Sequence, residues 1–213
     1  MTSRRPGRKS PIIVVAGESR NDCAVLKKLI PVLYPGACPN VEEINDEIRL
    51  VAAINQLSPR VETIRKRALA KAKDCRADLA GVVVHADLDG VADESYDRVR
   101  ERVTAQLRRG LPCNSALALA AVEMEAWLMQ FPDAFPKVKP GWAMRAEDCG
   151  KDLAYLPKPK KHLKKHLGKP LYLESHSPLI MEAAVRHGHV SARPSGNNRS
   201  FRDFADELAG WKK

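Results

Sequence analysis

The segment LAGVVVHADLDG, residues 79–90, decides the fold class of this 213-residue chain. It opens with a continuous run of apolar and β-branched residues, Leu79 to His85, which is typical of a strand buried on both faces. An acidic pair, Asp87 and Asp89, follows at once, and Gly90 closes the segment. Strands buried on both faces occur in parallel sheets covered by helices, so we expect an α/β protein.

Two further apolar runs, residues 12–16 and 116–122, have the same character. Helical patterns separate the three runs, most clearly over residues 93–109. Alternating strands and helices predict a Rossmann-like, mostly parallel sheet in which the three runs are neighbours. Residues 41–45 fit a short additional strand, although residues 41–57 also fit a helix.

Composition divides the chain into three predicted parts. Residues 1–10 carry four basic and no acidic side chains and predict a flexible basic arm. Residues 11–130 hold the three apolar runs and form the predicted α/β domain. Residues 131–213 are rich in proline and lysine, and we expect a basic, partly helical C-terminal extension packed on the domain. Its last predicted helix starts at Phe201, with Ser200 as the N-cap.

The net charge of +10 is concentrated in two segments, the arm and residues 137–170. The second segment carries ten basic and three acidic side chains. Such a concentration indicates either a polyanionic partner, most often nucleic acid, or a solvated surface that keeps the protein soluble.

Membrane insertion and disulfide bonding are not expected. No apolar run approaches the roughly 20 residues that a membrane-spanning helix needs, and the N-terminal segment does not resemble a secretory signal. The five cysteines are odd in number and form no CxxC pair. We therefore expect a cytoplasmic protein with reduced thiols.

Acidic residues follow each apolar run, at the carboxyl edge that parallel strands share. Gathered carboxylates repel one another unless a cation lies among them, and Mg²⁺ prefers carboxylate oxygens. Asp22 is either a further ligand or the N-cap of the first helix. We therefore predict a Mg²⁺ or Mn²⁺ site with the candidate ligands Glu18, Asp22, Asp87, Asp89, Glu123 and Glu125.

Other residues give weaker signals of a site. If Glu123 begins a helix, it and Glu125 point about 200° apart, and only one faces the site. His85 fits either a core histidine, the interpretation we favour, or a partner of the acidic pair. His162 and His166 are four residues apart, but they lie in a lysine-rich stretch that favours a basic surface over zinc binding.

Residues 12–130 resemble the TOPRIM domain of topoisomerases, bacterial primases and OLD-type nucleases. The resemblance lies in IIVVAGES, in GVVVHADLDG and, for an uncharacterised bacterial branch of the family, in AAVEMEAWLM. It implies Mg²⁺-dependent chemistry at phosphodiesters, with Asp87 and Asp89 as the acidic pair, and in some branches phage defence beside an ATPase partner. The family glutamate usually precedes the glycine, where this chain has Ala16, and Glu18 comes two residues later.

Our leading hypothesis is a metal-dependent nuclease with Glu18, Asp87 and Asp89 as its catalytic residues. The lysines that would bind the phosphates of nucleic acid are Lys158, Lys160, Lys161, Lys164 and Lys165. One alternative is a non-catalytic nucleic-acid or protein binding module with a degenerate site. Another is a phosphatase of the haloacid-dehalogenase type, in which DLDGV supplies Asp87 as the nucleophile and Asp89 as the acid/base. The sequence does not distinguish DNA from RNA.

Overall fold

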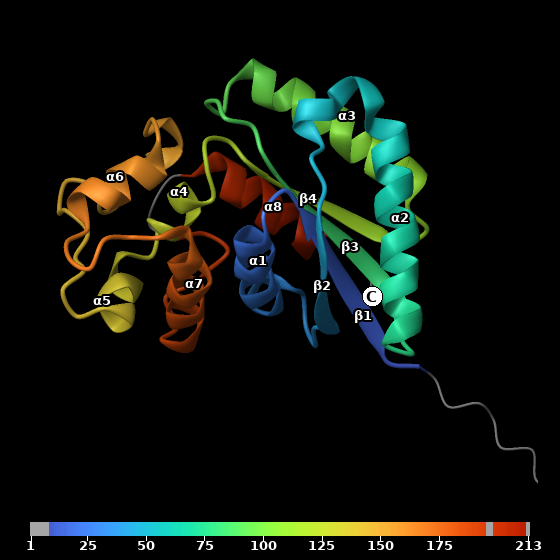
Figure 1. The fold of residues 1–213 in the computed structure, drawn as a ribbon, viewed down its shortest axis with the longest axis horizontal. Helices are drawn as coiled ribbons and strands as arrows, with labels where there is room; N and C mark the ends of the chain where they lie inside the picture. Colours follow the sequence, from blue (N-terminus) through green and yellow to red (C-terminus); the bar gives the residue numbers. More distant parts are fainter. Residues whose placement is uncertain (1–8, 195–197, 212–213) are drawn as a thin grey trace, which may run out of the picture.

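One open, all-parallel sheet organises the chain, for which a computed structural model describes residues 9–194 and 198–211 (Figure 1). The three predicted runs are neighbouring strands of this sheet, as expected. The strands, in the spatial order β2-β1-β3-β4, are β1 (Pro11–Gly17), β2 (Asn40–Glu47), β3 (Asp78–Asp87) and β4 (Asn114–Ala120). Most of the predicted basic arm, residues 1–8, lies outside the described residues.

The ambiguous segment after residue 40 is a strand. β2 pairs in parallel with β1, with Ile13 opposite Val41 and Val15 opposite Glu43. It lies at the edge of the sheet, where no other strand among the described residues pairs with its outer side. Only Val41 and Ile44 within it are buried, which explains why its sequence lacks the continuous apolar run of the central strands.

Helices cover both faces of the sheet. α1 (Arg20–Leu33) packs on the face that carries Ile13 and Val15. α2 (Leu57–Asp74) and α3 (Glu94–Gly110) pack on the opposite face. Successive residues of β1 therefore face different helices, and every one of them must be apolar. No helix of the described chain has both the length and the apolar character that crossing a membrane requires.

The C-terminal segment adds further helices on the α1 side. Trp127 is buried against Phe201 and Phe204, with ring centroids 5.4 and 5.6 Å away. Its indole nitrogen donates to Ser200 Oγ at 2.8 Å. The segment therefore shares its hydrophobic core with the sheet. The helices after β4 are α4 (Glu125–Leu128), α5 (Phe135–Val138), α6 (Pro159–His166), α7 (Ser177–Arg186) and α8 (Arg199–Ala209).

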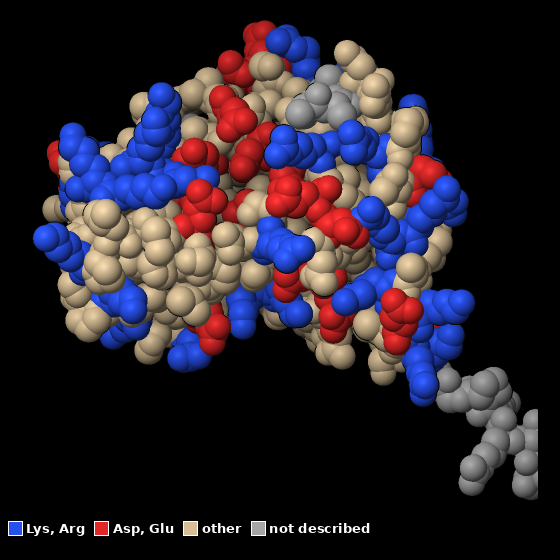
Figure 2. All heavy atoms as spheres, in the orientation of Figure 1, with Lys and Arg blue, Asp and Glu red and all other residues tan. Residues whose placement is uncertain are grey.

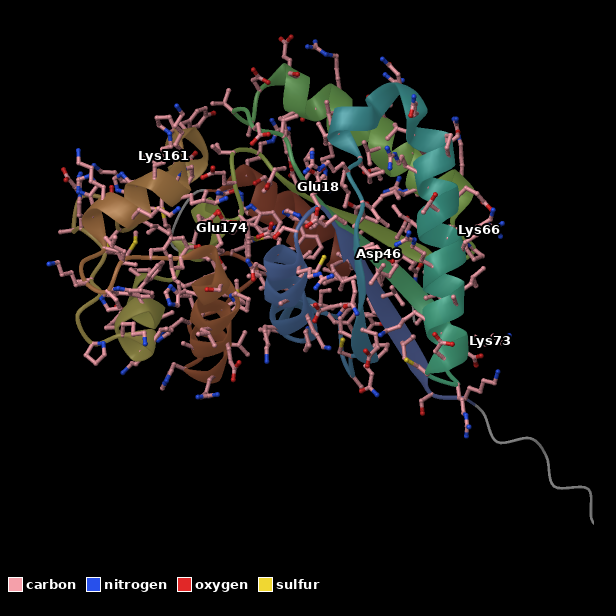
Figure 3. The ribbon with its side chains drawn as sticks, viewed as in Figure 1. Glu18, Asp46, Lys66, Lys73, Lys161 and Glu174 are labelled. Atoms are coloured by element: carbon pink, nitrogen blue, oxygen red, sulfur yellow. The ribbon has the colours of Figure 1, made fainter. Side chains whose placement is uncertain are left out.

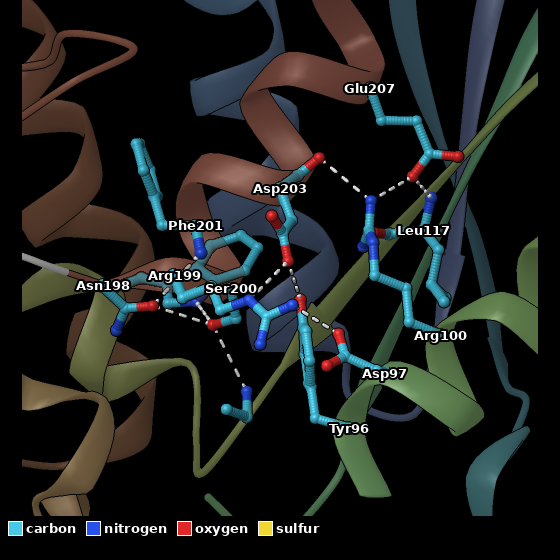
Figure 4. Close-up of polar contacts among 12 residues, drawn as sticks. Tyr96, Asp97, Arg100, Leu117, Asn198, Arg199, Ser200, Phe201, Asp203 and Glu207 are labelled. Atoms are coloured by element: carbon cyan, nitrogen blue, oxygen red, sulfur yellow. Dashed lines mark hydrogen bonds and ion pairs between the residues drawn. The ribbon is translucent and has the colours of Figure 1, made fainter. Parts of the chain in front are cut away.

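Side chains from α3 and α8 close the outer edge of β4 (Figure 4). Arg100 donates to the carbonyl of Leu117 at 3.1 Å and to the carboxylate of Glu207 at 2.6 Å. The same carboxylate accepts from the amide of Leu117 at 3.3 Å. Both backbone groups of Leu117 thus have partners, although no strand in the described part of the chain pairs with this edge.

Two helix starts differ from the sequence predictions. Ser19, not Asp22, is the N-cap of α1, because its backbone is extended and its hydroxyl accepts from the Asp22 amide at 3.4 Å. Asp22 lies in the first turn, where its side chain is free to face the sheet edge. Asn198, not Ser200, caps α8 and accepts from the Phe201 amide at 3.1 Å.

Candidate active site at the carboxyl edge of the sheet

A pocket of 320 Å³ lies beyond the carboxyl ends of β1 and β3. These strands are neighbours, yet α1 follows β1 on one face and α3 follows β3 on the other. Such a switch point opens a crevice in which parallel α/β sheets bind their ligands. The residues lining the pocket are Glu18, Ser19, Asp22, Arg49, Asp87, Asp89, Glu125, Lys160 and Glu174. Figure 3 shows Glu18 at this end of the sheet.

Asp22, His85 and Asp87 form the innermost group of the site. One potential ligand atom from each lies within 4.8 Å of the others. His85 is fully buried, with Nδ1 3.8 Å from Asp22 Oδ2 and Nε2 3.4 Å from Asp87 Oδ1. Gly17 makes room for it, since a Cβ on Gly17 would lie 2.8 Å from the Cβ of His85.

Several buried polar atoms of this group and of the neighbouring Glu18 have no hydrogen-bond partner among the described residues. They are both ring nitrogens of His85, Oδ1 of Asp87 and Oε1 of Glu18. Burying such atoms without partners costs free energy, and gathered carboxylates also repel one another. A proton on the imidazole would offset part of this negative charge, and a divalent cation would offset more of it.

The ionisation of these residues reflects burial opposed by neighbouring charges. Burial by itself lowers the pKa of His85, but the charges of Asp87 and Asp22 outweigh burial and raise it to about 9. Burial raises the pKa of Glu18 and of Asp22, with His85 partly opposing the rise. Without a metal, His85 is thus the counter-ion of the carboxylates at neutral pH.

Asp89 reaches the pocket through a turn rather than through strand alternation. Its backbone is left-handed, with φ of 57°. The amides of its neighbours Leu88 and Gly90 donate to the carbonyls of Ala120 and Ala121 at 2.8 and 2.9 Å. These bonds fix the segment beside the end of β4, and both aspartates of the predicted pair line the same pocket.

Glu125 forms the opposite wall with residues from the C-terminal segment. It is 4% exposed and accepts from Tyr172 Oη at 2.9 Å, while Tyr172 also contacts Ser177 Oγ at 2.5 Å. Burial raises the pKa of Glu125 to about 7, although Lys160 and the Tyr172 hydroxyl oppose the rise. The Lys160 ammonium lies 3.3 Å from Glu174. Lys160 is the lysine that lines the acidic pocket.

Glu123, which the sequence analysis predicted as a further metal ligand, lies outside the acidic pocket. Its carboxylate accepts from the backbone amide of Lys160 at 2.8 Å. This bond satisfies an amide in the first turn of α6. Only one of the two glutamates, Glu125, therefore lies in the pocket.

A second pocket of 520 Å³, here called the lysine groove, adjoins the acidic pocket and shares Asp89 and Lys160 with it. Figure 2 shows the basic side chains over α6 next to the acidic cluster. Lys165 is not among the residues that line the groove. The lining residues are Asp89, Gly90, Val91, Val122, Glu123, Tyr155, Leu156, Pro157, Lys158, Lys160, Lys161 and Lys164.

The histidine pair of α6 does not form a metal site. His162 Nε2 lies 2.8 Å from Asp148 Oδ2, and His166 faces Arg145 at 3.5 Å. Over the described ranges, the only group of three or more suitable side chains close enough to hold a metal is the one around His85.

His85, for which the sequence favoured a core role, lies with Asp22 and Asp87 in the site, and several other residues that line the pocket were not predicted. His85 precedes Asp87 by two positions, so strand alternation already indicated that the two share a face. Arg49 and Glu174 carry no local signal, because they reach the pocket through the folding of distant segments.

Comparisons of the chain with protein-family models, with characterised proteins and with solved structures find no match. The resemblance to TOPRIM proteins therefore stays a prediction.

Proposed function

We propose that this chain is a metal-dependent phosphodiesterase that cleaves nucleic acid, with its catalytic centre in the acidic pocket. The observation that carries the proposal is the group formed by Asp22, His85 and Asp87, whose ligand atoms lie within 4.8 Å of one another. The buried atoms of His85, Asp87 and Glu18 that lack a hydrogen-bond partner favour a bound cation, which would offset the repulsion between the carboxylates.

The donor set suits Mg²⁺ or Mn²⁺. Asp22 and Asp87 offer oxygen ligands, and Glu18 and Asp89 line the same pocket. His85 would add a nitrogen ligand or hold the two aspartates in place. When bound, such a cation supplies Lewis-acid stabilisation for the charge that develops on a phosphodiester during cleavage.

Side chains of the protein would supply a positive charge for the substrate phosphate and a carboxyl group for proton transfer. Lys160, at the junction of the two pockets, is suited to hold a phosphate oxygen of the substrate beside the acidic group. Glu125 is held by Tyr172, and its pKa of about 7 suits the transfer of a proton at neutral pH. The lysine groove provides the basic surface that a nucleic-acid backbone requires.

Membership of the TOPRIM family would be consistent with this function. Asp87 and Asp89, which the resemblance identifies as the acidic pair, line the acidic pocket together with Glu18, the third residue of the leading hypothesis. Glu18 would then take the role of the family glutamate from a position two residues later in the chain. A phage-defence role with an ATPase partner belongs to the same proposal.

A cleavage assay tests the proposal. Labelled single-stranded and duplex DNA and RNA are incubated with the protein and Mg²⁺ or Mn²⁺. We expect cleavage that EDTA abolishes and that Asp87→Asn reduces at least ~100-fold, as for loss of a group that organises transition-state charge. Asp78→Asn, the same change at the exposed opposite end of β3, is the control and should cleave normally.

Two results would replace the proposal with an alternative. Binding of nucleic acid without cleavage under both metals would favour the non-catalytic module. Trapping of a beryllium fluoride adduct on Asp87 would favour a phosphatase of the haloacid-dehalogenase type.

A further inference from the structure

The lysine groove contains the one exposed aromatic side chain of the described residues. Tyr155 is 61% exposed, whereas every other tryptophan, tyrosine and phenylalanine in the described chain is buried or half-buried. Tyr155 ends a short 3-10 turn, Leu153–Tyr155, directly before the segment that leads into α6. An exposed ring in a chain that buries its other aromatics indicates a surface that a ligand covers.

The surroundings of Tyr155 combine an apolar wall with positive charge. Leu156 and Pro157 follow the ring in the chain and line the groove with it, as does Val91, which is 41% exposed. Four lysines line the same groove, and of these only Lys160 forms an ion pair within the described chain. An aromatic platform beside unpaired lysines matches a base together with the phosphates that flank it.

The groove leads directly into the acidic pocket. Asp89 and Lys160 line both cavities. The bond between Glu123 and the Lys160 amide, 2.8 Å long, ties the start of α6 to the end of the sheet. A strand lying in the groove would therefore pass the acidic group at a defined position.

We propose that the lysine groove binds an unpaired nucleic-acid strand, with one base stacked on Tyr155. The phosphates next to that base would contact Lys158, Lys161 and Lys164. A base within a duplex has both faces covered by its neighbours and could not stack on Tyr155, so the substrate class is single-stranded nucleic acid or an unpaired end. This inference rests on the proposed function, since it names the substrate of the same site.

Binding measurements with the full chain test the inference. Short fluorescein-labelled oligothymidine, oligouridine and a DNA duplex are titrated by fluorescence anisotropy in EDTA, which prevents metal-dependent cleavage. Tyr155→Ala should weaken binding of the single strands roughly 5- to 150-fold, the usual effect of losing one stacking partner. Tyr155→Phe keeps the ring and should retain the affinity, and the exposed Leu179→Ala on α7 should bind as the wild type does.

Duplex binding, salt dependence and competition distinguish base stacking on Tyr155 from electrostatic attraction to the lysines. Tyr155→Ala should leave duplex binding and the salt dependence unchanged, because the number of phosphate contacts is the same. Unchanged affinity of Tyr155→Ala for single strands would overturn the inference, as would an equal loss for the duplex. Competition by polyglutamate as strong as that by the oligonucleotide would also overturn it, in favour of an acidic protein partner. Because cleavage is not measured, these outcomes are independent of whether the site is catalytic.

Discussion

Glu125 is expected to make the protein less stable as the pH rises. Its carboxyl is 4% exposed, and burial raises its pKa from an ordinary 4.5 to about 7. Between these values the folded state binds a proton at Glu125 that the unfolded state has released. The resulting penalty on folding is absent below about pH 4.5 and is fully present above about pH 7.

The structure sets the size of this penalty. A difference of one between the folded and unfolded pKa corresponds to about 1.4 kcal/mol. The rise from 4.5 to about 7 therefore corresponds to about 3 kcal/mol. Glu125→Gln removes the charge and keeps an oxygen that can accept from Tyr172. The variant should gain about 3 kcal/mol over the wild type near pH 8, or roughly 6–12 °C in Tm for a chain of this length.

Urea unfolding followed by circular dichroism near pH 5 and pH 8 measures the effect. The two proteins should differ much less near pH 5, because most of the wild-type carboxyl is then protonated in the folded state. Glu94→Gln is the control, since that side chain is 93% exposed and its replacement should leave the stability close to that of the wild type. A stability difference that is the same at both pH values, or a variant less stable than the wild type near pH 8, would refute the reasoning.

Two further predictions concern the basic surface and the packing of the site. If the lysines of α6 bind phosphates, the slope of log affinity against log salt concentration should become shallower by about one for each lost contact. Equal slopes for the wild type and the variant would show that these lysines only keep the surface solvated. The variant carries Lys160→Gln, Lys161→Gln, Lys164→Gln and Lys165→Gln. Gly17→Ala should cost about 1–3 kcal/mol in urea unfolding, because its Cβ would lie 2.8 Å from that of His85. Gly90→Ala, whose nearest neighbour atom is 3.8 Å away, is the control, and equal stability of the two variants would show that His85 is packed differently.

The central strands were predictable because burial on both faces requires apolar residues at every position. Residues 12–16 and 79–84 meet that requirement and lie side by side in the sheet. β2 was ambiguous because an edge strand is only partly buried, and its polar residues also suit a helix. The start of α1 was misassigned because the segment from Ser19 to Asp22 offers several capping side chains, and only backbone geometry distinguishes them.

The site residues that lie at the ends of strands could be predicted from the sequence. Asp87 ends a buried strand and Asp89 follows two residues later, and the carboxyl ends of parallel strands meet at one edge of the sheet. The opposite wall was not predictable in the same way. Glu125 and Lys160 reach the pocket because α4 and α6 pack together, which depends on contacts between distant parts of the chain.

Manganese binding is the most direct test of the central claim that the acidic pocket holds a divalent cation. The wild type and a double variant, Asp22→Asn with Asp87→Asn, are titrated with Mn²⁺, and free Mn²⁺ is followed by electron paramagnetic resonance. A second double variant, Asp46→Asn with Asp78→Asn, changes two exposed aspartates outside the pocket and serves as the control. We predict that the wild type and the control bind Mn²⁺ with the same affinity and that the first variant, still folded, does not bind it. Equal Mn²⁺ affinity in all three proteins would contradict the account.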